Sequence, residues 1–222
     1  MSDPLLDNDG LPRFSEIRPE QVESAMDQLI ADNKAKLEAL LDDLDTPTWQ
    51  NLIEVTEEWD DRLSRAWSPV QHMNSVVNSD ELRAAYNACL PKLSAYGTEL
   101  GQNERLYAAY KALDESGKAL DDAQRKVLSN ALRDFRLSGV DLSPEKKARY
   151  KEISQELSQL TARFDEHLLD ATNAWSKHIE DEQELAGLPK SALALAKQTA
   201  EQRDLTGYVL TLDFPSYFPV MS

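Results

Sequence analysis

Residues 143–179, with the sequence SPEKKARYKEISQELSQLTARFDEHLLDATNAWSKHI, decide the fold of this chain. They open with a helix start signal, Ser143-Pro144-Glu145. Apolar residues then recur three or four positions apart, which predicts one apolar stripe along a helix: Tyr150, Ile153, Leu157, Leu160, Phe164, Leu168, Ala171, Trp175 and Ile179. Polar residues between them predict a face turned to water: Lys151, Glu152, Gln155, Glu156, Arg163, Asp165 and Asp170.

The length of this helix limits the possible shapes of the protein. At about 1.5 Å per residue, a helix over residues 144–179 spans about 54 Å. A compact chain of this size has a radius of gyration of about 17 Å, which corresponds to a sphere about 44 Å across. The sequence therefore predicts either an elongated bundle or a chain that forms one wall of a larger protein.

The rest of the chain predicts an all-α fold. It has only 7 glycines and is rich in good helix formers, so few residues are available for tight hairpins. Periodic segments appear near residues 19–45, 47–67, 80–100, 103–117, 121–138 and 191–202. We expect an elongated antiparallel helical bundle of about seven to eight helices, broken or kinked at Ser68-Pro69 and at Pro91.

The end of the chain has a different pattern. Residues 208–213, YVLTLD, predict one short C-terminal β-strand, and a loop follows it. A strand must pair its backbone groups, and no second convincing strand pattern precedes it. We therefore expect its partner strand outside this chain. Residues 1–206 are predicted to form a helical lobe, and residues 207–222 a strand and loop leading out of it.

Composition restricts the partners and the compartment. The net charge of −16 argues against nucleic acid, because phosphate binding requires clustered basic residues. The acidic surface either keeps the protein soluble or attracts cationic peptides. No secretory signal or membrane-spanning stretch is present, and a single cysteine cannot form an internal disulfide. We expect a cytoplasmic protein with no membrane partner.

Few residues suggest catalysis or metal binding. On the predicted helix, His167 and His178 are separated by about 16 Å of rise, too far to share a zinc ion. A site formed by His178 with Asp181 or Glu182 is a weak possibility, because structural zinc usually has four nitrogen or sulfur ligands. We expect the third histidine, His72, at a surface position. The same is expected of the paired carboxylates, which are Asp42 and Asp43, Glu57 and Glu58, and Asp60 and Asp61.

Cys89 lies on a predicted apolar face, where a buried and unreactive thiol is usual. No nucleophile elbow or phosphate-binding loop is present. We therefore predict no catalytic, cofactor-binding or metal residue. Two stretches, 67–75 and 170–175, combine tryptophan with short polar side chains. They indicate either packing around an indole ring or the lining of a peptide channel.

Several blocks of sequence resemble the thimet oligopeptidase family of zinc metallopeptidases. They run in order along essentially the whole chain: LPRFSEIRPEQV (11–22), WSPVQHMNSVVNSDELRAAY (67–86), NALRDFRLSGVDL (130–142), LLDATNAW (168–175), DEQELAGLPKSALA (181–194) and GYVLTLDFPSYFPVM (207–221). The resemblance implies cytoplasmic, mostly helical endopeptidases that cleave short peptides, including released signal peptides. It also implies two lobes around a deep channel.

In that family the zinc site, His-Glu-x-x-His with a more distant Glu, belongs to the C-terminal half. No residue of this sequence matches that motif. The resemblance therefore implies zinc in the full-length enzyme and none on this chain. It implies an N-terminal lobe that forms scaffold and one channel wall, is inactive alone, and has the catalytic half and short peptides as partners. The alternatives are a self-standing helical interaction module or dimer, and a metal-binding role around His178.

Overall fold

The computed structural model describes residues 3–7, 10–117 and 119–222. Contacts within the chain divide it into two compact units, Met1–Gln159 and Leu160–Ser222. The predicted division into a helical lobe, residues 1–206, and a strand and loop leading out of it, residues 207–222, refers to a longer polypeptide and remains a prediction.

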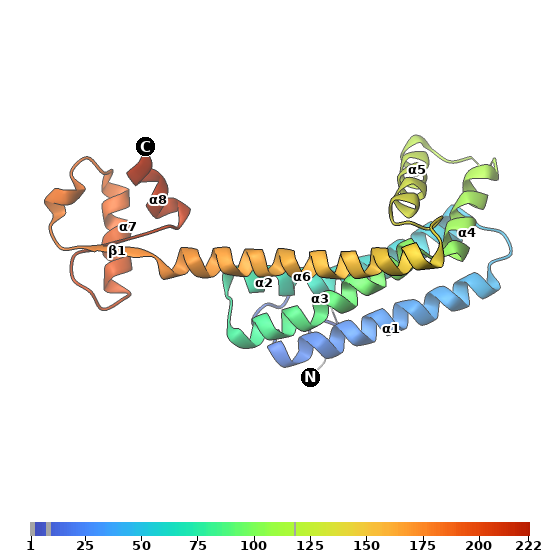
Figure 1. Ribbon diagram of the computed structural model, residues 1–222, viewed down its shortest axis with the longest axis horizontal. Helices are drawn as coiled ribbons and strands as arrows, with labels where there is room; N and C mark the ends of the chain where they lie inside the picture. Colours follow the sequence, from blue (N-terminus) through green and yellow to red (C-terminus); the bar gives the residue numbers. More distant parts are fainter. Residues whose placement is uncertain (1–2, 8–9, 118) are drawn as a thin grey trace. The chain divides into compact units, whose positions relative to one another are not determined.

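Three long helices form the first part of unit 1. They are α1 (Pro19–Asp43), α2 (Val55–Val76), which follows the π-helical turn η1 (Trp49–Glu54), and α3 (Asp80–Gly101). Ser79 begins α3, since its side chain accepts a hydrogen bond from the Leu82 amide at 3.2 Å. The three helices lie side by side in Figure 1. They enclose a core that includes Leu5, Val22, Ala25, Met26, Leu29, Ile30, Leu63, Ala66, Val70, Leu82 and Cys89.

Two shorter helices complete the packed part of unit 1: α4 (Glu104–Glu115) and α5 (Asp122–Leu137). The side chains of Asn103 and Asp121 cap them by accepting hydrogen bonds from the Leu106 and Gln124 amides at 2.9 and 2.8 Å. A second core forms where they meet η1 and the end of α1, and it buries Leu37, Leu52, Ile53, Leu106, Tyr110, Leu113, Leu128, Leu132, Phe135 and Val140.

The end of α2 differs from the prediction. The helix continues past Pro69 to Val76 instead of ending near residue 67, whereas Pro91 lies within α3, without a break in the helix. Pro69 is buried, so apolar burial offsets part of the cost of the hydrogen bond that proline cannot make.

Unit 2 corrects two further expectations. The long helix α6 is Pro144–Ala174, and residues after it form the strand β1 (Ser176–Ile179) instead of more helix. This strand pairs antiparallel with β2 (Tyr208–Thr211), in a register that places Ser176 opposite Thr211 and Ile179 opposite Tyr208. The partner of the C-terminal strand is therefore within the chain, and the expectation of an outside partner was wrong.

The remaining elements of unit 2 are the 3₁₀ turn η2 (Glu182–Leu185), α7 (Lys190–Glu201) and α8 (Phe214–Met221), the last of which was expected to be a loop. Gly207 allows β2 to approach β1 closely: its φ is +83°, and a Cβ there would lie 2.5 Å from the Ile179 carbonyl oxygen. Ile179, Leu185, Ala196 and Leu210 form a buried cluster, and Ala200 and Val209 are buried as well.

The all-α class is confirmed, with eight α-helices and one two-stranded sheet in the described ranges. Of the helices there, none meets the length and hydropathy that a bilayer crossing requires.

Candidate functional site

The N-terminal half of α6 departs from the predicted division into a buried and an exposed face, although Tyr150 is half-buried and Glu152 and Glu156 are exposed, as expected. Ile153 and Leu157, from the predicted buried stripe, are 49% and 62% exposed. The half-buried residues are instead mainly polar: Lys147, Tyr150, Lys151, Ser154, Gln155 and Ser158. The prediction that Lys151 and Gln155 face water was therefore wrong. No residue of α6 is buried, so in unit 1 the apolar side of this helix is uncovered.

Ion pairs hold this part of α6 to its neighbours. Lys147 pairs with Glu104 at the start of α4. Lys151 donates to Glu99 of α3 at 2.7 Å, and Lys34 of α1 donates to the same carboxylate at 2.6 Å. These hydrogen bonds, first from Lys151 and then from Lys34, lower the pKa of Glu99. Charge and hydrogen bonding attach the helix where apolar packing was expected.

We expect Glu99→Gln to lower the free energy of unfolding of unit 1 by less than about 1 kcal/mol at pH 7, because the pairs are partly exposed. A carboxyl group whose pKa is lower in the folded protein than its unfolded value, near 4.5, stabilises the fold at pH values above 4.5. That stabilisation is lost as the pH falls through the lower pKa of the folded state. The difference between the variant and the unmodified chain should therefore shrink below pH 4.5. Urea denaturation followed by tryptophan fluorescence measures it. A difference that is constant with pH, or equal for the exposed Glu54→Gln control, would contradict this role.

Unit 2 also leaves much apolar surface uncovered. On the C-terminal half of α6, Leu160, Phe164 and Leu168 are all exposed, Phe164 by 68%. On α8, the rings of Phe214 and Phe218 stack on each other at 5.2 Å between centroids, and both side chains are exposed. Small domains are marginally stable because they bury a low fraction of their surface. A unit as small as this one gains stability from any surface that covers these side chains.

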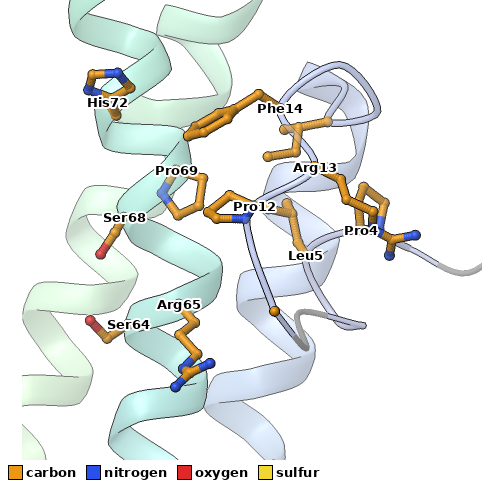
Figure 2. Close-up of a pocket in the computed structure, with 12 residues that line it drawn as sticks. Pro4, Leu5, Pro12, Arg13, Phe14, Ser64, Arg65, Ser68, Pro69 and His72 are labelled. Atoms are coloured by element: carbon orange, nitrogen blue, oxygen red, sulfur yellow. The ribbon is translucent and has the colours of Figure 1, made fainter.

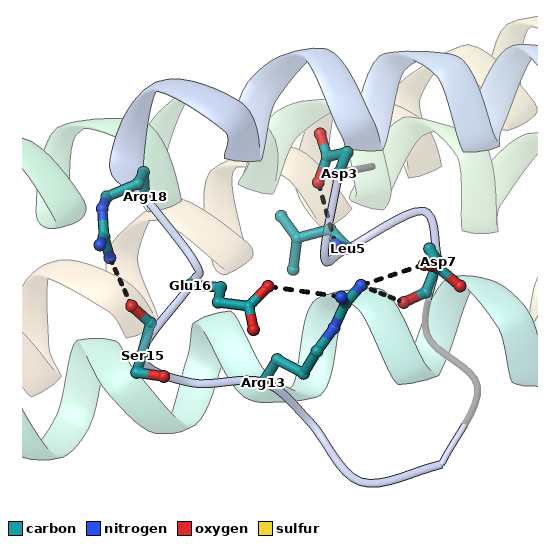
Figure 3. Close-up of polar contacts among 7 residues, drawn as sticks. All are labelled: Asp3, Leu5, Asp7, Arg13, Ser15, Glu16 and Arg18. Atoms are coloured by element: carbon teal, nitrogen blue, oxygen red, sulfur yellow. Dashed lines mark hydrogen bonds and ion pairs between the residues drawn. The ribbon is translucent and has the colours of Figure 1, made fainter. Parts of the chain in front are cut away.

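The N-terminal arm of unit 1, residues 3–7 and 10–18, lies against α2 and is fixed by local polar contacts (Figure 3). Arg13 Nη2 donates to the Asp7 carbonyl at 2.9 Å and pairs with its carboxylate at 3.3 Å, while Nη1 pairs with Glu16 at 3.3 Å. Arg18 Nη1 donates to the Ser15 carbonyl at 2.8 Å. Leu5 anchors the arm in the core with 1% of its side chain exposed.

A cleft of about 420 Å³ lies between this arm and α2 (Figure 2). Its apolar lining comes from both: Pro4, Leu5, Pro12, Phe14 and Ile17 from the arm, and Pro69 from α2. Its polar lining is Arg13, Ser64, Arg65, Ser68 and His72, with Gly10 completing the set. The Phe14 and His72 rings are 5.9 Å apart. In size and lining, the cleft resembles small-molecule sites.

The weak metal candidate, His178 with Asp181 or Glu182, does not form a metal site among the described residues. His178 lies on β1 instead of the helix, and its Nε2 lies 2.6 Å from the Thr206 carbonyl, which can only accept a hydrogen bond. Asp181 accepts from the Gln183 amide, and Glu182 accepts from the Tyr208 hydroxyl at 2.5 Å. Within the described ranges, no group of three or more His, Cys, Asp or Glu could hold a metal ion. These residues do not fit a zinc ion, and zinc on another part of a longer protein stays a prediction.

The other candidates occupy structural positions. Cys89 is fully buried, and burial raises the pKa of its thiol to about 11, so it is protonated at neutral pH. Trp67 stacks on Tyr86 across α2 and α3, with ring centroids 5.0 Å apart, as packing around an indole predicts. In the second polar–aromatic stretch, Trp175 is 44% exposed. All six paired carboxylates are exposed.

Sequence reasoning did not predict the cleft, although the stretch 67–75, which it singled out, contributes Ser68, Pro69 and His72 to the lining. A signal was available in α2: Ser64, Ser68 and His72 are spaced four apart, as are Arg65 and Pro69, so all five lie on neighbouring ridges of the helix. The apolar wall comes from the arm, which contributes no periodic pattern.

The chain belongs to the neurolysin/thimet oligopeptidase family, since residues 26–147, more than half of it, match the family model "Neurolysin/Thimet oligopeptidase, N-terminal domain". It is similar over its whole length to oligopeptidase A of Haemophilus influenzae, at 52% identity, and of Escherichia coli, at 49%. It is 35% identical to "Probable cytosolic oligopeptidase A" of Arabidopsis thaliana over 99% of its length.

These matches confirm the resemblance to the N-terminal region of oligopeptidase A. The chain spans 33% of the length of the two bacterial relatives and 32% of the plant relative.

Proposed function

We propose that this chain is the N-terminal helical lobe of a zinc-dependent, cytoplasmic oligopeptidase that hydrolyses short peptides such as signal-peptide fragments. In this proposal it acts as scaffold and as one wall of the substrate channel, and the zinc site is carried by a C-terminal catalytic half. Support comes from its membership of the thimet oligopeptidase family and from relatives, named oligopeptidase A, that are about three times as long.

The observation that carries the proposal is the uncovered apolar side of α6. The exposed apolar residues of α6 are Ile153 and Leu157 in unit 1, and Leu160, Phe164 and Leu168 in unit 2. Full burial of a large apolar side chain contributes about 1.5–3 kcal/mol, so leaving such rows in water forgoes substantial stability. The additional chain present in the relatives supplies a surface that covers them.

A second copy of the chain is the alternative occupant, because exposed apolar rows also favour self-association. In that case the protein is a self-standing interaction module or dimer without enzymatic activity. Light scattering of the purified chain distinguishes the two: a stable dimer that protects α6 from hydrogen exchange favours the module.

The proposal is tested with a fluorogenic peptide. We expect no cleavage by the 222-residue chain, with or without added zinc. We expect cleavage when the chain is co-expressed with the complementary two-thirds of Haemophilus influenzae oligopeptidase A, which serves alone as the control. Metal-dependent cleavage by the 222-residue chain alone would overturn the proposal, as would failure of the two parts to associate.

A further inference from the structure

The cleft between the N-terminal arm and α2 has an unusual charge for this protein. The chain holds 40 acidic residues against 24 Lys and Arg, yet among the residues that the structure describes, none of the twelve that line the cleft is acidic. The charged side chains there are Arg13 and Arg65, and the other polar groups are Ser64, Ser68 and His72. Asp7, Glu16 and Asp61 pair with these two arginines from outside the lining, so an anion could bind here only through hydrogen-bond donors that those carboxylates leave unused.

The two arginines differ in what they can still bind. Arg13 is occupied, because its terminal nitrogens contact Asp7 and Glu16. Arg65 uses Nε to donate to Asp61 at 2.7 Å, and among the described residues its two terminal amino groups have no hydrogen-bond partner. Those two groups form the edge of the guanidinium that binds a carboxylate through two parallel hydrogen bonds.

Further unpartnered polar groups lie on the same helix. In the described ranges no hydrogen bond is made by the hydroxyl of Ser64 or Ser68. Figure 2 shows the rings of Phe14, Pro12 and Pro69 near one another, with Arg65 further along α2. Pro69 and Arg65 are one turn apart on α2, about 6 Å of rise, so the cleft offers an apolar contact and a cation along the same helix.

We propose that this cleft binds a small apolar carboxylate, with the apolar group against Phe14 and Pro69 and the carboxylate on the terminal amino groups of Arg65. The hydroxyl of Ser68, on the helix ridge next to that of Arg65, donates a further hydrogen bond to the carboxylate. The C-terminal residue of a short peptide and a simple arylalkyl acid share this chemistry.

The test is an NMR titration of the ¹⁵N-labelled 222-residue chain with three probes: N-acetylphenylalanine, its C-terminal amide, and 4-phenylbutyrate. We expect N-acetylphenylalanine to shift amide signals of residues 12–17 and 64–72, and the amide to bind at least about tenfold more weakly, because it lacks the charge. Binding of 4-phenylbutyrate as well identifies a site for simple apolar acids. Binding of N-acetylphenylalanine alone identifies a site for peptide C termini.

Three variants test whether Arg65 binds the carboxylate directly or acts only through the net charge of the protein. We expect Arg65→Gln to weaken binding of N-acetylphenylalanine by about tenfold and to leave its amide unaffected. Arg62→Gln makes the same charge change one turn away, outside the cleft, and should not alter binding. Ser68→Phe fills the cleft and should block all three probes, with circular dichroism as the check that α2 remains folded. Equal binding of acid and amide, equal effects of the two arginine variants, or shifts confined to other residues would overturn the proposal.

Discussion

Leu157→Asp will prevent the chain from associating with the complementary two-thirds of Haemophilus influenzae oligopeptidase A, and peptide cleavage by the mixture will fall by about a hundredfold or more. The leucine is 62% exposed in this chain, so the substitution leaves the fold of unit 1 intact. Once a second surface covers it, the new carboxylate must be buried without a partner, which costs several kcal/mol. Co-purification and the fluorogenic assay measure the two effects.

Ala148→Asp is the matched control for this prediction. It adds the same charge to an exposed position on the opposite side of α6, within the same unit. Association should then be close to that of the unmodified chain. If both aspartate variants assemble normally, the uncovered side of α6 is not the docking surface. If both fail, the effect is one of net charge.

Leu29→Ala will lower the free energy of unfolding of unit 1 by about 2–5 kcal/mol. Leu29 is fully buried in the core shared by α1, α2 and α3, so alanine removes apolar contacts and leaves a cavity that rigid helices cannot close. The measurement is urea denaturation in a Trp175→Phe background. The three remaining tryptophans, Trp49, Trp59 and Trp67, then all report on unit 1.

Leu157→Ala provides the comparison, because it makes the same chemical change at an exposed position. Its effect should remain within about 0.5 kcal/mol. A change below about 1 kcal/mol for Leu29→Ala would show that this core is loosely packed.

Local periodicity was sufficient to predict α1. Val22, Met26, Leu29, Ile30 and Leu37 recur at helical spacing, and all of them are buried. The same reasoning identified α6 as a helix but assigned its inward face wrongly. Periodicity shows that a helix has an apolar side, whereas the contacts that a given stretch of chain provides decide which side is covered.

The strand β1 could not be predicted from its own residues. Ile179 continues the helical spacing of α6, so the local pattern favours helix. Its conformation depends on pairing with β2, far along the sequence, and that pairing requires Gly207 to let the backbones approach. The cleft depends in the same way on distant residues, because Phe14 of the arm meets His72 of α2 only after folding.

The pairing of β1 with β2 also sets an order of events on the ribosome. About thirty residues separate Ile179 from the first residues of β2. At synthesis rates of about 5–20 residues per second, β1 therefore waits about 1.5–6 s for its partner. During that interval the backbone groups of β1 have no strand to pair with, so this part of unit 2 can form only after the second strand has been synthesised.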